Sequence, residues 1–345
     1  MAATEVTGRQ PEVKIATTPR NLALIGCGAI ARAFYLPFLA KRRGDFGRVW
    51  LVDPNDGARA IAASIVPASQ AHCLLEIDDD IHLAIVATPN QLHFPVAYEA
   101  LSRGAHVLVE KPFVTCPEQA RRLAQAATAG RRVVAINQTR RFFPLARELR
   151  TQIKEGNLGS LKSVVHREGV RLTWPFESGA AFAPGAQRTG VIMDFGVHVI
   201  DFYHYLLQPK WRLRSAIHDG FAGPEGLAEI ELEANDATVS IRLSRYYPQQ
   251  NVARLVFERA EISFDIFDGT MYRIQRNAGR VTELVLAKAA TDFGSYADLL
   301  LSNFLAACDN LEPALCDCWS SLPVIEILDQ IYHSAARYPA NLGSV

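Results

Sequence analysis

The sequence lacks an excess of charge of either sign and has no long apolar run. Lys and Arg together number 36 among 345 residues, as do Asp and Glu, so the formal net charge is zero. Nucleic acids and anionic membrane surfaces attract proteins through clustered positive charge, so this balance argues against both as partners. The apolar stretches are strand-sized and interrupted, so no segment is predicted to span a bilayer.

Cysteine is present without the spacings that carry chemistry, because the six cysteines include no Cys-x-x-Cys pair. In a chain of this length that usage is typical of reduced thiols and favours a cytoplasmic protein over a disulfide framework. Cys316 and Cys318 are close in sequence, but no nearby His or third Cys completes a metal site, so no metal is predicted. Residues 1–20 lack the apolar core and cleavage pattern of a signal peptide and are expected to form an N-terminal extension.

What the sequence contains is an ordinary globular balance, with 49% hydrophobic and 21% charged residues. The length suggests about two domains. The first third alternates apolar runs with helical stretches, a pattern typical of a doubly wound parallel sheet that binds ligands at the carboxyl ends of its strands. The predicted strands are 21–25, 49–53, 81–88, 106–110 and 132–136, and the predicted helices are 29–40, 57–64, 93–103 and 117–129.

The pattern changes after about residue 150, where outward polar residues alternate with inward aliphatic ones. This alternation predicts an antiparallel meander with one packed face, followed by helical periodicity over 295–336. We therefore expect a Rossmann domain over 21–141 and an α+β domain with an open, mainly antiparallel sheet over 142–345. The predicted strands of that sheet are 229–233, 239–243, 251–257, 261–266, 270–275 and 281–286.

A G-x-G-x-x-A motif stands between the first predicted strand and the helix that follows. Gly26 permits a tight turn, Gly28 lets a pyrophosphate approach the backbone, and Ala31 is small enough for close packing of helix on strand. The N–H groups of the helix N-terminus favour phosphates. We therefore predict a dinucleotide site, whose contacts in this loop are Gly26, Gly28, Ala29 and Ile30.

The second predicted strand ends at Asp53, 22 residues after Ala31 and close to the place of a ribose-binding acid. Its carboxylate is suited to accept hydrogen bonds from ribose hydroxyls and would repel a 2′-phosphate. Pro54 and Asn55 supply no cation to offset that repulsion. The sequence thus favours NAD over NADP.

The predicted strand 81–88 should end at the same edge of the sheet as the glycine motif. Thr88, Pro89 and Asn90 stand at this end and are predicted to contact the coenzyme. His93 follows shortly after and is a further candidate for that contact. For His93, helix capping or packing is an equally good interpretation.

The predicted strand 106–110 ends in Glu110-Lys111-Pro112, and its first two residues are expected beside the coenzyme. The chain has only seven lysines against 29 arginines, so an ammonium here is less readily explained as general surface charge. A lysine at a strand's carboxyl end can donate to a substrate oxygen and stabilise a developing alkoxide. The alternative is a surface Glu–Lys pair.

A helix is predicted around the stretch Asp194-Phe-Gly-Val-His198-Val-Ile-Asp201. Its three polar residues fall on one stripe, and apolar stripes flank them, so the helix should be buried with its polar stripe lining a cleft or meeting partners. His198 can take a hydroxyl proton near neutral pH, and Asp194, one turn away, can orient it or bind substrate. The alternative is a structural His–Asp contact.

Together, G-C-G-A-I-A at 26–31, A-T-P-N-Q-L-H at 87–93, E-K-P at 110–112 and D-F-G-V-H-V-I-D at 194–201 resemble the glucose-fructose oxidoreductase / inositol dehydrogenase / MocA family. The resemblance implies that Lys111 lies beside the nicotinamide and holds the reacting hydroxyl. It implies that His198 is the general acid/base and that Asp194 binds substrate or orients His198. It also makes Lys111–Pro112 a candidate cis peptide.

The reaction implied by the resemblance is hydride transfer between NAD and a secondary hydroxyl or keto carbon of a sugar, cyclitol or sugar derivative. The second domain would bind this substrate and form a homodimer or homotetramer through its sheet. Family members often have several small glycines before the D-x-x-x-H helix, whereas here only Gly190 remains. The implied substrate contacts are Lys111, Arg141, Trp174, Arg188, Asp194 and His198.

A different class stays open, namely a non-catalytic NAD-binding sugar sensor on the same fold. Such a sensor does not need a proton-transfer set. The presence of Lys111, Asp194 and His198 together therefore favours an enzyme.

Overall fold

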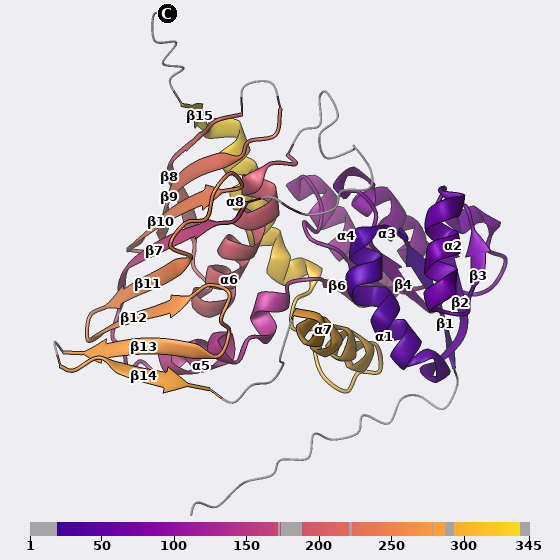
Figure 1. Cartoon of the computed structure of the whole chain (residues 1–345), viewed down its shortest axis with the longest axis horizontal. Helices are drawn as coiled ribbons and strands as arrows, with labels where there is room; N and C mark the ends of the chain where they lie inside the picture. Colours follow the sequence, from indigo (N-terminus) through magenta and orange to yellow (C-terminus); the bar gives the residue numbers. More distant parts are fainter. Residues whose placement is uncertain are drawn as a thin grey trace, which may run out of the picture.

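The computed structural model describes residues 19–171, 173, 188–220, 223–277, 279–286 and 293–338. Figure 1 shows two sheets side by side, with helices packed on both and between them. Within these residues, no helix has the length and apolar character needed to cross a bilayer.

The first sheet is parallel and has the strand order β3-β2-β1-β4-β5-β6, so the order reverses between β1 and β4. This arrangement confirms the predicted doubly wound sheet and puts the ligand edge beside the ends of β1 and β4. The short β3 was missed because its three residues contain no apolar run. The strands are β1 (Arg20–Ile25), β2 (Phe46–Val52), β3 (Ser69–Ala71), β4 (Leu83–Val86), β5 (His106–Val109) and β6 (Val134–Ile136).

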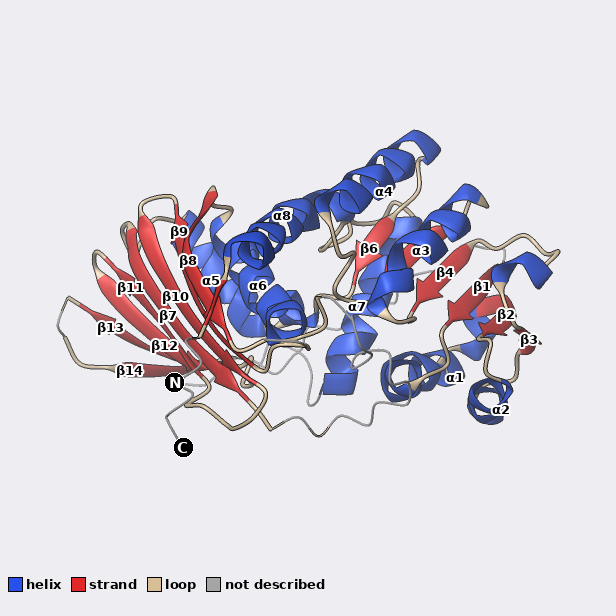
Figure 2. Ribbon diagram, turned by 90° about the horizontal axis from the view of Figure 1, so that it is seen from above, coloured by secondary structure: helices blue, strands red, loops and turns tan. Residues whose placement is uncertain are grey.

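Helices cover both faces of this sheet, which explains why its central strands are apolar throughout. All four residues of β4 are buried. In Figure 2, α3 and α4 lie on one face and α1 and α2 on the other. The helices are α1 (Leu36–Lys41), preceded by the π-helical turn η1 (Ala31–Tyr35), then α2 (Asp56–Ile65), α3 (His93–Ser102) and α4 (Pro117–Gly130).

The second sheet has the order β14-β13-β12-β11-β7-β10-β9-β8-β15 and is mixed, mostly antiparallel. The predicted simple meander is wrong at two places: β7 lies between β10 and β11 and runs parallel to β10, and the edge strand β15 runs parallel to β8. The inward residues of β7 include His166 and Glu168, and these polar residues hid its alternation. The strands are β7 (Leu161–Gly169), β8 (Trp211–His218), β9 (Leu227–Ala234), β10 (Ala237–Ser244), β11 (Val252–Phe257), β12 (Ala260–Asp265), β13 (Met271–Arg276), β14 (Thr282–Val285) and β15 (Ala336–Arg337).

The remaining helices connect the two sheets. The 3₁₀ turn η5 (Thr139–Phe142) follows β6, and α7 (Phe293–Cys308) contacts both η5 and η1. Helix α8 (Cys318–Ser334) contacts α4 of the first sheet and β8 of the second. It starts at a capping box between Asp317 and Ser320. The others are α5 (Pro144–Lys154), the π-helical turn η7 (Ile192–Gly196) and α6 (Val197–Leu207).

Candidate active site

The carboxyl edge of the parallel sheet contains a turn that only glycine fits. Gly26 has a φ of +96°, and a Cβ atom there would lie 2.4 Å from the carbonyl oxygen of Ala87. Its N–H donates to the carbonyl oxygen of Val52 at 2.8 Å, so the turn is held against both neighbouring strands. The Gly28 carbonyl accepts the N–H of Arg32 at 3.1 Å and starts the helix, whose first N–H groups have no partner inside the helix. These features fit a dinucleotide, whose phosphates the free N–H groups would hold.

Asp53, directly after β2, closes onto this turn. Its Oδ2 accepts the N–H of Cys27 at 2.9 Å, and its Oδ1 accepts the N–H of Asn55 at 2.8 Å. Each oxygen keeps a further lone pair for a ribose hydroxyl. A cation does stand nearby, although the next two residues supply none: the buried Arg59 donates to the Asp53 carbonyl oxygen and pairs with Asp56. Helix α2 brings position 59 back to the strand end, which local sequence context does not reveal.

The loop after β4 contains a buried hydroxyl, Thr88 Oγ1, that has no hydrogen-bond partner among the residues that the structure describes. His93 is 1% exposed, and its ring lies between two carbonyl oxygens. Nδ1 is 2.7 Å from that of Pro112, and Nε2 is 2.9 Å from that of Thr88. Burial lowers the pKa of His93. The ring therefore joins two loops of the sheet edge, which is the packing interpretation. Between the two residues lie Pro89 and the 3₁₀ turn Asn90–Leu92.

Glu110, at the end of β5, is buried and directed into the protein. Its Oε1 accepts the Tyr35 hydroxyl and the Asn137 side-chain amide, both at 2.6 Å, while Oε2 accepts the N–H of Lys111 at 3.0 Å. Burial raises the pKa of Glu110. These contacts fix the loop from behind, and the peptide bond between Lys111 and Pro112 is cis, as expected.

Lys111, which follows β5 of the first sheet, contacts Asp194 on the helical turn η7, which packs against β10 of the second sheet. The Lys111 Nζ lies 2.5 Å from Asp194 Oδ1, and Arg245, just after β10, lies 2.8 Å from Asp194 Oδ2. Although burial opposes its ionisation, the charges of Lys111 and Arg245 hold the pKa of Asp194 well below its usual range. Lys111, Arg245 and Asp194, called the trio below, together carry a net charge of +1. Because Asp194 and Lys111 are partly exposed, this charge lies at an accessible place.

The helix that carries Asp194 begins against a buried carboxylate. Glu225 accepts the N–H of Ile192 at 3.1 Å and the hydroxyl of Tyr332 at 2.7 Å, and its carbonyl accepts the N–H of Val191. A Cβ atom on Gly190 would lie 2.0 Å from the carboxyl carbon of Glu225. The single glycine before the D-x-x-x-H motif is therefore the residue that admits this cap.

His198 points its Nδ1 at the side-chain oxygen of Gln138, 3.0 Å away. An N–H on Nδ1 donates to that oxygen and leaves the Nε2 lone pair free for a proton. Burial lowers the pKa of His198 well below its ordinary value, and the charges of Lys111 and Arg140 lower it further. The ring is consequently neutral near pH 7, as a proton acceptor requires.

Behind His198 runs a buried polar network. Arg140 makes two hydrogen bonds to Glu168, at 2.9 and 2.6 Å, and Glu168 also lies 3.0 Å from Nε2 of His166. The other ring nitrogen of His166 lies 3.0 Å from the hydroxyl of Tyr203. Burial opposes ionisation of Glu168, but Arg140 and His166 outweigh it and lower the pKa of this carboxyl. The network holds a cation close to His198.

Arg141, predicted to contact substrate, is 2% exposed. It forms a bidentate pair with Asp201, at 2.9 and 2.7 Å. It also donates to the Leu315 carbonyl oxygen and to the Ser320 hydroxyl. The guanidinium thus ties the first sheet's last loop to α6 and α8, and this placement argues against substrate contact.

Arg188 also reaches neighbouring elements. It donates to the Thr115 carbonyl oxygen at 2.5 Å, pairs with Asp329 at 2.6 Å and lies over the ring of Tyr332. Trp174 lies outside the described residues.

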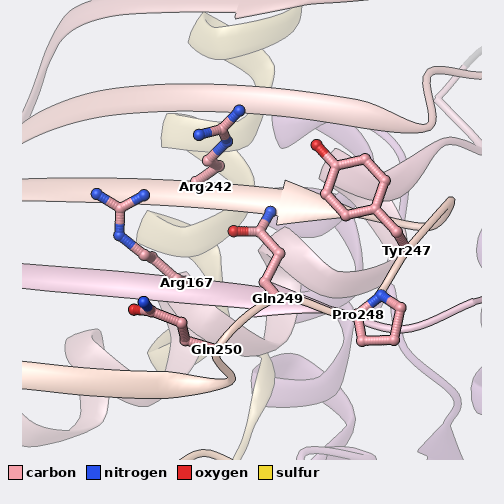
Figure 3. A pocket seen from close by; sticks show the side chains of 6 residues that line it. All are labelled: Arg167, Arg242, Tyr247, Pro248, Gln249 and Gln250. Atoms are coloured by element: carbon pink, nitrogen blue, oxygen red, sulfur yellow. The ribbon is translucent and has the colours of Figure 1, made fainter.

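A hollow of about 390 Å³ lies away from these residues, on the outer face of the second sheet (Figure 3). It contains none of the predicted site residues. Its lining residues are Arg167, Arg242, Tyr247, Pro248, Gln249 and Gln250. Among the described residues, no group of His, Cys, Asp and Glu side chains is arranged to hold a metal.

Three residues of the site were missed by sequence reasoning. Gln138 and Arg245 each stand just after a strand, so the rule used for Lys111 would have marked them. Glu225 had no such signal, because it lies in a loop and meets Gly190 only in the folded chain.

Comparison with known proteins finds a family match over the first sheet, which includes the glycine turn and Lys111. Residues 20–138 match the model of the Gfo/Idh/MocA oxidoreductase family with its NAD-binding Rossmann fold. The chain is 30% identical over 197 residues to a D-glucoside 3-dehydrogenase of Escherichia coli (strain K12), which covers 55% of each protein. It is 28% identical over 221 residues to a 1,5-anhydro-D-fructose reductase of Ensifer adhaerens, which covers 60% of this chain and 62% of that protein. The chain thus spans about half the length of the curated relatives it matches.

Solved structures share the fold over nearly the whole chain. A levoglucosan dehydrogenase, solved with NADH and levoglucosan, has a TM-score of 0.79 at 20% identity and covers 92% of this chain and 97% of its own. A 3-ketoreductase from Actinomadura kijaniata, solved with NADP and TDP-benzene, has a TM-score of 0.79 at 19% identity and covers 93% of this chain and 100% of its own. The matched residues 20–138, which include the glycine turn, Asp53 and Lys111, are therefore similar to the NAD-binding domain of the Gfo/Idh/MocA oxidoreductase family.

Proposed function

We propose that this protein is an NAD-dependent oxidoreductase that transfers hydride between the nicotinamide and a secondary hydroxyl or keto carbon of a sugar, cyclitol or sugar derivative. The observation that carries the proposal is the meeting of Lys111 and Asp194 at 2.5 Å, with His198 one helical turn further on. Residues 21–141 would bind the coenzyme and residues 142–345 the substrate.

Bound NAD would supply the hydride acceptor in the oxidising direction. Lys111 would donate a hydrogen bond to the reacting oxygen, and the positive charge it shares with Arg245 would stabilise negative charge on that oxygen. Neutral His198, held by Gln138, would accept the hydroxyl proton at Nε2. Asp194 would keep the Lys111 side chain in place.

The primary experiment follows nicotinamide absorbance with NAD⁺ against sugars, sugar acids, inositols and nucleotide sugars. We expect turnover with a member of this panel and a loss of about 100- to 1000-fold in the Lys111→Ala variant. Binding of NADH to both proteins is the control for folding. NADH binding without turnover across the panel would favour the sugar sensor, and a fully active variant would remove Lys111 from the chemistry.

We further propose a preference for NAD over NADP. The carboxylate of Asp53, held beside the glycine turn, would accept hydrogen bonds from the ribose hydroxyls, and the nearby Arg59 is occupied by Asp56 and the Asp53 carbonyl oxygen. NADH should therefore bind at least about tenfold more tightly than NADPH, which corresponds to about 1.4 kcal/mol. Fluorescence titration of both coenzymes measures this ratio, and equal affinities would refute the preference. Asp53→Ser should reduce the difference between the affinities for NADH and NADPH.

On the family resemblance we also propose a cytoplasmic homodimer or homotetramer that associates through the outer face of the second sheet. Sedimentation of the wild type measures the mass in solution. A monomer at micromolar concentration would refute the association.

A further inference from the structure

Arg245 stands opposite Lys111 on the same carboxylate. Its side chain is 7% exposed, and it reaches Asp194 from the end of β10, whereas Lys111 reaches it from the end of β5. A second bond, to the carbonyl oxygen of Thr189 at 3.0 Å, holds the guanidinium at the start of the helix that carries Asp194. The β10 end is itself fixed by the Arg245 N–H, which donates to the Gly226 carbonyl oxygen.

The charges of the trio determine how strongly Lys111 can interact with a further anion. One carboxylate facing one ammonium gives a neutral pair, and a tightly held ammonium has little field left for another anion. A second cation on the other carboxylate oxygen leaves a net charge of +1. Lys111 and Asp194 keep side-chain exposures of 20% and 27%, while Arg245 is nearly enclosed. The excess positive charge is therefore accessible from the side of the trio where Lys111 lies.

We propose that Arg245 is a positioning residue that shares the charge of Asp194 and thereby leaves Lys111 able to stabilise an oxyanion beside its exposed side. The inference rests on the proposed function, because the oxyanion is that of the reacting hydroxyl. It assigns to this chain a requirement for two cations, one from each sheet, around a single carboxylate.

The test compares Arg245→Gln, which removes the charge, with Arg245→Lys, which keeps it. The matched control is Arg242→Gln, three residues earlier on β10, whose guanidinium pairs with Glu229 on the outer face. We expect Arg245→Gln to lower kcat about 10- to 100-fold with little change in KM, because the interaction matters most when charge develops. Arg245→Lys should recover much of the loss, and Arg242→Gln should match the wild type. Equal kcat values in Arg245→Gln and the wild type would overturn the proposal.

A second measurement does not depend on turnover. An amine-reactive acetylating ester, followed by peptide mass spectrometry, gives the reaction rate of Lys111 with the six other lysines as internal references. Lys111 should react more slowly in Arg245→Gln, because Asp194 then holds it alone, and more quickly in Asp194→Asn. Unchanged Lys111 rates, in variants that melt cooperatively and bind NADH, would overturn the charge sharing. If the wild type turned over no substrate while these rates shifted as expected, the proposed function would fail and the charge sharing would stand.

Discussion

Two aspartates seven residues apart on one helical segment, Asp194 and Asp201, are each paired with a cation from the first sheet. The pair of Lys111 with Asp194 has side-chain exposures of 20% and 27%, whereas those of Arg141 and Asp201 are 3% and 1%. The first pair has one hydrogen bond between its side chains, and the second is bidentate. The same chemical components thus form an accessible, electrostatically unbalanced site at one end and a closed, balanced cross-link at the other.

Both pairs join an aspartate to a cation, so residue type does not distinguish the proposed catalytic pair from the structural one. Exposure and charge balance do. A buried bidentate pair presents no accessible oxygen and no net charge to a substrate, so its role is to hold elements together. A partly exposed trio with excess positive charge can act on a developing anion.

The largest expected effect comes from breaking the closed pair. Asp201→Asn leaves the Arg141 charge buried and unpaired, which should lower the free energy of unfolding by about 3–5 kcal/mol. Asp194→Asn removes the counter-charge of the partly exposed Lys111 and of the enclosed Arg245, which keeps its bond to the Thr189 carbonyl oxygen. It should therefore lower the free energy of unfolding by less, about 1–3 kcal/mol, while abolishing turnover. Urea denaturation of the two variants measures the difference. Similar losses of stability in both would mean that the contrast in burial has no energetic meaning.

The sequence patterns predicted the parallel sheet, which the structure confirms. Contiguous motifs also marked Lys111, Asp194 and His198, of which the structure brings Lys111 and Asp194 into contact; their catalytic roles stay a prediction. The prediction that Arg141 contacts substrate did not anticipate its burial, because the sequence does not show that Arg141 pairs with Asp201 while its neighbour Arg140 pairs with Glu168. Asp201 lies 60 residues from Arg141 and Glu168 lies 28 residues from Arg140, and pairing over such separations leaves no local pattern.

A smaller effect is expected at Gly190, where the accessible site depends on the cap of its helix. Gly190→Ala places a methyl group on the Glu225 carboxylate, which is fixed by Tyr332 and Ile192. We expect a loss of about 1–3 kcal/mol in stability and a fall in turnover as Asp194 shifts. In a Glu225→Ala background the same substitution should have little further effect on stability. A double-mutant cycle with additive losses would show that the two residues are not in contact.

The smallest expected effect concerns the pH at which the accessible site loses activity. His198 faces the cations Lys111 and Arg140 and the anions Asp194 and Glu168, and its pKa is lowered. Turnover in the oxidising direction requires the neutral ring. The turnover rate should therefore be at its maximum above the ordinary histidine pKa of about 6.5, and it should fall only as the pH drops through the lower pKa of His198 in the folded protein.

Removing one of the cations beside His198 should shift this acid limb. In Arg140→Gln the pKa of His198 should rise, so the limb should move to higher pH, by up to about one pH unit. Arg140→Lys retains the charge and should keep the limb in place, and kcat profiles from pH 4 to 8 distinguish the two. If both variants follow the wild-type profile, the acid limb of kcat reports the titration of a group other than His198. The charges around the accessible site would then not set the pKa of the proposed proton acceptor.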